Sequence, residues 1–147
     1  MLDARGHGPT VCAGPVAARG ATIARLGFAL VFVWFGALKF WPGLSPAQPL
    51  VEATVGWIVG PAWFVPFLGV WEVAMGIGLL LDRWRRLMLG LLFAHMAGTF
   101  MPFFSCPELV WSDPPFVWTL EGQYILKNVV FTGAAMMLWG RPKDVSR

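Results

Sequence analysis

Long apolar stretches, separated by short polar or aromatic segments, dominate the hydrophobic pattern of this chain. A helix needs about 20 residues to cross the hydrocarbon core of a bilayer. Four stretches reach that length, at about residues 22–41, 62–81, 86–104 and 120–139. The pattern therefore predicts an all-α membrane protein, a four-transmembrane-helix bundle.

The fourth stretch is more polar than the other three. Its uninterrupted apolar run, residues 129–139, covers only about 16 Å at the helical rise. To cross a membrane, the helix must extend back through Lys127 and Gln123 to about Leu120. Because lipid cannot solvate these polar groups, we expect this half of the helix to line the bundle interior.

Arg and Lys are concentrated before the first stretch, between the second and third, and after the fourth. The other two connecting segments carry the acidic residues Glu52, Glu108 and Asp113. Segments rich in Arg and Lys stay on the cytoplasmic side of a membrane. Both termini are therefore predicted to be cytoplasmic, which requires an even number of crossings and supports the fourth span.

The ends of the chain flank a predicted membrane domain at 22–140. Residues 1–21, rich in Gly, Ala and Pro, and residues 141–147 are expected to form cytoplasmic tails. A cleaved signal peptide is the alternative for the first stretch, with "SPA" at 45–47 as the processing site. The apolar run is long for a signal peptide and Lys39 precedes that site, so we favour a retained helix.

A short helix is predicted in the first outer loop, 42–61. Ser45, Pro46 and Gln48 match the N-cap, N1 and N3 positions of a capping box. The residues that follow at helical spacing on one face are Leu50, Val51, Thr54, Val55 and Ile58. We expect this helix to lie in the outer interface or to dip into the mouth of the bundle. The second outer loop, 105–119, has three prolines and is expected to be irregular.

Composition agrees with a membrane protein of one domain. The 147 residues are 57% hydrophobic and 13% charged, with a mean hydropathy of +0.64. A soluble domain of this size would expose far more apolar surface than soluble monomers do. The net charge of +3 is divided among three separate places, so the sequence offers no basic patch for nucleic acid.

The two cysteines, Cys12 and Cys106, occur in no C-x-x-C motif and in no His/Cys spacing typical of zinc. Neither a disulfide framework nor a metal site is expected. Cys106 would lie at the outer surface, either as a reactive thiol or as an unpaired interfacial cysteine, and we favour the second interpretation.

Ionisable residues occur inside the predicted spans. Lys39 ends the first span at its outer end, Glu72 and His95 lie near mid-membrane, and Lys127 and Asn128 lie in the outer half of the fourth. A charged group at the bilayer centre costs about 2.5–3.5 kcal/mol on insertion scales. These side chains should therefore face the bundle interior and one another.

Gly69 and Gly76 lie one turn on either side of Glu72, where another helix could approach closely. The simplest arrangement pairs Glu72 with Lys127 or with Lys39. The residues expected to add hydrogen bonds are His95, Gln123, Tyr124 and Asn128. A polar pocket that opens outward between the helices would result.

Such a cluster has a structural and a functional interpretation. It could lock a small bundle or hold a partner subunit without any chemistry. It could also bind a small amphipathic molecule, such as a quinone head group or a proton-coupled ligand. His95 alone supplies at most one axial ligand to a haem, so haem is not favoured. The sequence assigns no catalytic residues.

Three motifs resemble the DoxX-like family of small bacterial inner-membrane proteins, in particular its YkgB-type branch. They are "LVFVWFGALKF", "VWEVAMGIGLLL" and "LEGQYILKNVVF", and the resemblance runs from about residue 25 to residue 140. It implies a four-helix bundle in the bacterial inner membrane. The wider group includes subunits linked to thiosulfate:quinone oxidoreduction and proteins associated with oxidative-stress defence. The matching polar positions are Lys39, Glu72, Glu121, Lys127 and Asn128.

Three functions are therefore weighed. The first is an accessory or anchoring subunit of a membrane redox or respiratory assembly, in contact with lipid and with other subunits or further copies. The second is a quinone-binding component in which Glu72, His95 and Lys127 line the head-group site. The third, a small transporter or proton pathway, is disfavoured by the lack of an internal repeat. With no cysteine pair and no cofactor motif, the chain is not expected to be an autonomous enzyme or to hold a resident cofactor.

Overall fold

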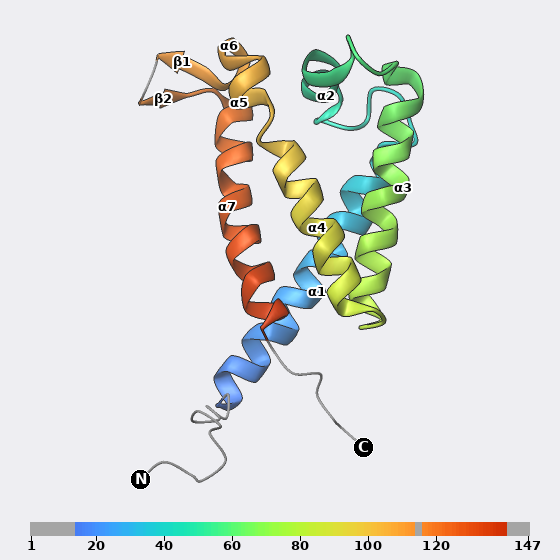
Figure 1. The fold of residues 1–147 in the computed structure, drawn as a ribbon, viewed down its shortest axis with the longest axis vertical. Coiled ribbons are helices and arrows are strands. Elements are labelled where there is room, and N and C mark those ends of the chain that lie inside the picture. Colours follow the sequence, from blue (N-terminus) through green and yellow to red (C-terminus); the bar gives the residue numbers. More distant parts are fainter. Residues whose placement is uncertain (1–13, 114–115, 141–147) are drawn as a thin grey trace, which may run out of the picture.

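A computed structural model describes residues 14–113 and 116–140, which are mostly helical (Figure 1). The helices are α1 (Pro15–Leu38), α2 (Gln48–Val55), α3 (Pro61–Leu80), α4 (Arg85–Thr99), α5 (Pro102–Ser105), α6 (Pro107–Val110) and α7 (Leu120–Trp139). A small antiparallel hairpin, β1 (Trp111–Asp113) and β2 (Val117–Trp118), precedes α7. We call the end of the molecule that carries α2, α5, α6 and this hairpin the hairpin end.

Three segments of the described chain are long and apolar enough to cross a membrane, which indicates a membrane protein. They are Pro15–Leu38, Ala62–Leu80 and Arg85–Ser105, the last of which combines α4 and α5. Pro102 has no N–H to continue the hydrogen-bond ladder of α4, and the chain resumes there as α5.

The predicted boundary of the first helix is wrong. α1 begins at Pro15 rather than at residue 22, so part of the predicted loose tail is helical. Proline suits the first position of a helix, because its fixed φ is helical and its missing N–H would have no partner there. Residues 1–13 and 141–147, the rest of the predicted tails, lie outside the described residues. The second and fourth predicted helices agree with α3 and α7.

Helices α1 and α3 pack closely because glycines face each other where they cross. A Cβ added to Gly69 would lie 2.8 Å from the carbonyl oxygen of Gly36, and one on Gly76 would lie 2.7 Å from Val33. A Cβ on Gly36 would lie 2.8 Å from the Cβ of Glu72. The predicted close approach at Gly69 and Gly76 is confirmed, and the neighbouring helix is α1.

The apolar core lies toward the end of the molecule opposite the hairpin end. It is formed by Phe28, Phe32, Met75, Leu79, Met88, Leu89, Leu92, Met96, Ala135 and Leu138 from α1, α3, α4 and α7. Figure 1 shows α7 alongside α4 and crossing α1 near this end. Arg25 donates to the carbonyl oxygens of Leu79 and Leu80, which have no partner within α3.

The helix predicted in the first outer loop is present as α2, but its predicted capping box is wrong. α2 begins at Gln48 with Ala47 as its N-cap residue, and no side chain caps it. The side chain of Gln48 is engaged elsewhere, since it accepts from the N–H of Gly43 at 3.0 Å and donates to Glu52 at 2.8 Å. Ser45 instead accepts a backbone hydrogen bond from Gln48 in a preceding turn.

The described residues of the second outer loop, 105–113 and 116–119, contain a short helix and a hairpin rather than the irregular structure predicted. Pro107 begins α6, where a missing N–H has no consequence. Trp111 faces Trp118 across the hairpin with ring centroids 4.0 Å apart. Thr119 then caps α7 by accepting from the N–H of Gly122.

Candidate functional site

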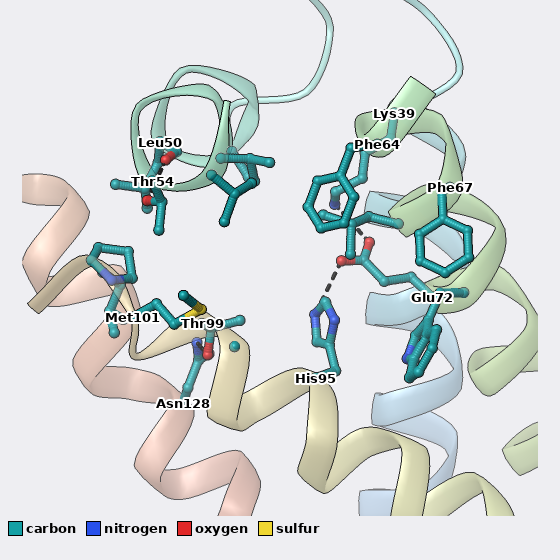
Figure 2. Close-up of a pocket in the computed structure, with 18 of the residues that line it drawn as sticks. Lys39, Leu50, Thr54, Phe64, Phe67, Glu72, His95, Thr99, Met101 and Asn128 are labelled. Atoms are coloured by element: carbon teal, nitrogen blue, oxygen red, sulfur yellow. Dashed lines mark hydrogen bonds and ion pairs between the residues drawn. The ribbon is translucent and has the colours of Figure 1, made fainter. Parts of the chain in front are cut away.

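Three polar side chains from three helices meet inside the bundle (Figure 2). Lys39 Nζ donates to Glu72 Oε2 at 2.6 Å, and His95 Nε2 lies 3.1 Å from Glu72 Oε1. Their side chains are 5%, 6% and 11% exposed, respectively. We call Lys39, Glu72 and His95 the polar trio. Glu72 is its centre, because each carboxylate oxygen has a different partner.

The local structure explains how Lys39 reaches Glu72. Lys39 is the C-cap residue of α1, and its ammonium also donates to the carbonyl of Phe35 at 3.4 Å. Gly36, one turn earlier, has no side chain to hold α3 away. The close crossing of α1 and α3 therefore brings the end of α1 against the middle of α3. Pairing offsets much of the desolvation that each charge would suffer alone.

A second polar group lies on the other side of the site. Asn128 of α7 donates to Thr99 Oγ1 at 3.0 Å, and Thr99 in turn donates to the carbonyl of Met96 at 2.7 Å. Figure 2 shows Asn128 and Thr99 across an open space from His95 and Glu72. The hydrogen bond joins α7 to α4 at this depth.

The space between the two polar groups is a pocket of about 450 Å³. Small-molecule sites have volumes of about 300–1,000 Å³ and mostly apolar linings with a few placed polar groups. Here the apolar lining comes chiefly from Phe64, Phe67, Leu68, Trp71, Ala94, Gly98 and Ile125. Leu50 and Thr54 of α2 extend the lining at the hairpin end, where Figure 2 shows them above the open space. The arrangement can therefore hold a small molecule with a polar head.

Five of the residues predicted for the site line this pocket: Lys39, Glu72, His95, Tyr124 and Asn128. Of the two lysines considered for Glu72, the structure pairs it with Lys39. Lys127 lies outside the lining, with its ammonium 4.8 Å from the centre of the Tyr124 ring. Its predicted place at a head-group site is therefore wrong. Residues Ile125 and Asn128 of α7 face the bundle, and Lys127 is about 100° away from Asn128 around the helix.

The remaining two predicted residues, Glu121 and Gln123, are also outside the pocket. Both are exposed near the start of α7. Glu121 lies in the first turn, where a negative charge is favourable. Gln123 donates to the carbonyl of Trp118 at 3.4 Å, so it joins the helix to the hairpin rather than to the polar trio.

The sequence interpretation missed the aromatic wall, and it left open whether the helix in 42–61 lies in the interface or dips into the mouth of the bundle, where α2 lines the pocket. Phe64, Leu68 and Glu72 recur at four-residue spacing, so a signal for their shared face was present. The position of α2 over the pocket depends on long-range contacts, and helical spacing within 42–61 carries no information about them.

Cys106 is buried rather than at the outer surface as predicted. Its thiol donates to the carbonyl oxygen of Ala53 in α2 at 3.3 Å. The residue lies where α5 meets α6, against the helix that covers the pocket. Cys12 lies outside the described residues.

None of the protein-family models, curated proteins or solved structures compared with the chain matches it. The resemblance to the DoxX-like family therefore stays a prediction. Within residues 14–113 and 116–140, no group of three or more His, Cys, Asp or Glu side chains is placed to hold a metal ion.

Proposed function

We propose that this protein binds a small amphipathic molecule in the pocket, and that a quinone head group is the ligand class that fits it best. The observation that carries the proposal is the polar trio on the wall of an otherwise apolar pocket of about 450 Å³. Lys39 and Glu72 neutralise each other, so the wall offers hydrogen bonds without a net charge when His95 is neutral. An uncharged polar head attached to an apolar body matches such a site.

His95 is the member of the trio best placed to meet a ligand. Its side chain is the most exposed of the three and lines the pocket. Glu72 fixes the orientation of the imidazole by accepting from Nε2, and Lys39 holds Glu72 in place. With a proton on Nε2, a neutral imidazole presents Nδ1 as an acceptor, which suits a hydroxyl of the reduced, diol form of the head group. The third N–H of Lys39 can donate to a carbonyl oxygen of the oxidised form. Glu72 acts as the positioning residue for both.

An open pocket favours ligand binding over a purely structural role for the polar cluster. A cluster that served only to lock the bundle would be expected to close around its own hydrogen bonds. We therefore propose a ligand-binding component of a membrane assembly, in which a partner subunit would supply any electrons. This combines the accessory-subunit and quinone-binding hypotheses and assigns no autonomous catalysis to the chain.

We also propose that α7 is a fourth membrane-spanning helix and that both termini lie on the cytoplasmic side of a bacterial inner membrane. α7 is 20 residues long and packs along α4, with Phe93 and Trp139 in ring contact at 5.9 Å. Its exposed residues beyond Lys127 include Val129, Val130, Met136 and Met137, which suit lipid. Lys127 lies nearer the hairpin end, where its long side chain can extend toward the interface.

Solvent extraction of the protein purified in its native lipid tests the binding proposal. We expect quinone to be retained above the level in lipid discs without protein, and His95→Ala to lose most of it. Lys127→Met is the control, since it removes a polar side chain of a neighbouring helix that lies outside the pocket lining, and it should retain quinone like the wild type. Equal retention by wild type, His95→Ala and empty discs would overturn the proposal.

A further inference from the structure

The floor of the pocket is formed by α4 where the helix carries two of its smallest residues. Ala94 and Gly98 both line the pocket and lie one turn apart on one face of the helix. A Cβ added to Gly98 would meet no atom within 4 Å. The space directly above the α4 backbone is therefore open to a ligand.

The two polar groups rise on either side of this floor. His95 and Thr99 are also one turn apart on α4, which places their Cβ atoms about 5–6 Å from each other. His95 continues the wall to Glu72, and Thr99 continues the opposite wall to Asn128 (Figure 2). A ligand that reaches both walls must therefore be compact, about as wide as one ring.

Aromatic side chains flank the floor. Phe64, Phe67 and Trp71 come from α3, and Tyr124 comes from α7. Aromatic surfaces favour flat rings, which can stack on them or meet them edge to face. The shape of the lining thus favours a planar ligand over a branched or globular one.

Both polar groups have hydrogen-bonding capacity left for a ligand. The Lys39 ammonium donates to Glu72 and to Phe35, and an ammonium has three N–H groups. Asn128 uses one N–H for Thr99, which leaves a second N–H and the amide oxygen. The walls can thus meet an oxygen at each side, whether carbonyl or hydroxyl. Because Lys39 and Glu72 cancel, a charged ligand would lack a counter-charge here.

We propose that the ligand is a flat, uncharged ring with oxygens at two opposite edges. It lies over Gly98, with one oxygen at the polar trio and the other at Asn128. The inference rests on the proposed function and deepens it: among quinone head groups it selects the para-dione and its diol form, and it places the ring in the pocket. Gly98 becomes a position that decides whether the ring fits, and Asn128 the residue that recognises the second oxygen.

Two probes separate this inference from the proposed function. Decylubiquinone has oxygens at both edges of its ring, and para-decylphenol has the same tail with one ring oxygen. Affinities would be measured by titration calorimetry with the protein in lipid nanodiscs. We expect the wild type to bind decylubiquinone about tenfold more tightly than the phenol, as one additional hydrogen bond would give.

Two substitutions test the placement of the ring. Asn128→Leu should lower the affinity for decylubiquinone to that of the phenol while leaving the affinity for the phenol unchanged, which also reports an intact pocket. Gly98→Leu should abolish binding of both probes. Gly133→Leu is the matched control, because a Cβ there also meets nothing within 4 Å and Gly133 lies outside the lining. Gly98→Ala, which adds only one methyl group, should weaken both probes less while the protein stays folded.

The outcomes are distinguishable. If the wild type binds both probes equally and Asn128→Leu changes nothing, the two-edged ligand is wrong and the amphipathic ligand remains. If both Gly98 variants bind like the wild type, the ring does not lie over Gly98 and the inference fails. If the folded wild type binds neither probe, the inference and the proposed function fail together.

Discussion

Glu72 connects the other two members of the polar trio, because Lys39 bonds one of its carboxylate oxygens and His95 bonds the other. All three side chains are almost fully withdrawn from the surface of the protein. Removing one partner of a buried ion pair leaves the other charge without compensation, whereas removing both can be nearly neutral. The energetic role of the trio can therefore be separated from its role in ligand binding.

At this scale, Lys39→Met should lower the free energy of unfolding by about 3–5 kcal/mol, since it leaves the Glu72 carboxylate with His95 alone. The double variant Lys39→Met with Glu72→Gln should recover more than half of that loss. Unfolding in mixed micelles measures both. Lys127→Met, which removes only a cation–π contact, should change the free energy by less than about 1 kcal/mol. An equal effect of Lys39→Met and Lys127→Met would contradict the account of the ion pair.

Most members of the site were predictable from the cost of burying polar groups in apolar spans. Lys39, Glu72, His95 and Asn128 were identified in this way, and each lines the pocket. The choice between Lys39 and Lys127 was not predictable, because it depends on how α7 is rotated about its axis. That rotation is set by packing against α4 and α1, which spacing within one helix does not reveal.

The packing of helices α1 and α3 depends on small residues at their crossing. Gly36→Ala should lower the free energy of unfolding by about 1–3 kcal/mol, because the new methyl group meets Glu72 Cβ and the Gly69 carbonyl oxygen. Gly27→Ala is the matched control on the same helix, since its Cβ meets nothing within 4 Å. It should be neutral or stabilising by up to about 1 kcal/mol. A loss equal to that of Gly36→Ala would show that the crossing is not the cause.

Helix α2 covers the pocket and is joined to the α5–α6 junction by Cys106. In a Cys12→Ser background, we expect Cys106 of the folded protein to react with a water-soluble maleimide far more slowly than in the unfolded protein. Burial of the thiol beneath α2 is the reason. Labelling at the unfolded rate would place the thiol at the surface and contradict the position of α2.

The elements differ in how far the sequence could predict them. The bounds of α3 and α7 follow from apolar length and flanking loops. The start of α2 does not, because the Gln48 side chain bonds the N–H of Gly43 and the carboxylate of Glu52 in the folded loop rather than the position a capping box requires. The hairpin was missed because the prolines of 105–119 predict irregular structure, and the spacing of Trp111 and Trp118 does not reveal that they pair across two strands.

The bundle is filled by apolar side chains at the end opposite the hairpin end and contains the pocket nearer the hairpin end. The apolar core joins α1, α3, α4 and α7 away from the hairpin end, and the pocket lies between the polar groups nearer to it. If α7 crosses the membrane as proposed, the hairpin end faces outward. Alkaline phosphatase fused after residue 147 should then be inactive, and the same fusion after Ser112 should be active. Activity after residue 147 would contradict four spans with cytoplasmic termini.

The central claim is that the pocket between the polar trio and Asn128 holds a ring-shaped ligand. An experimental structure of the protein purified in native lipid tests this most directly. We predict density for a flat ring over Gly98, with one edge at His95 and Lys39 and the other at Asn128. A pocket closed by its own side chains, or filled only by a lipid acyl chain, would contradict the claim.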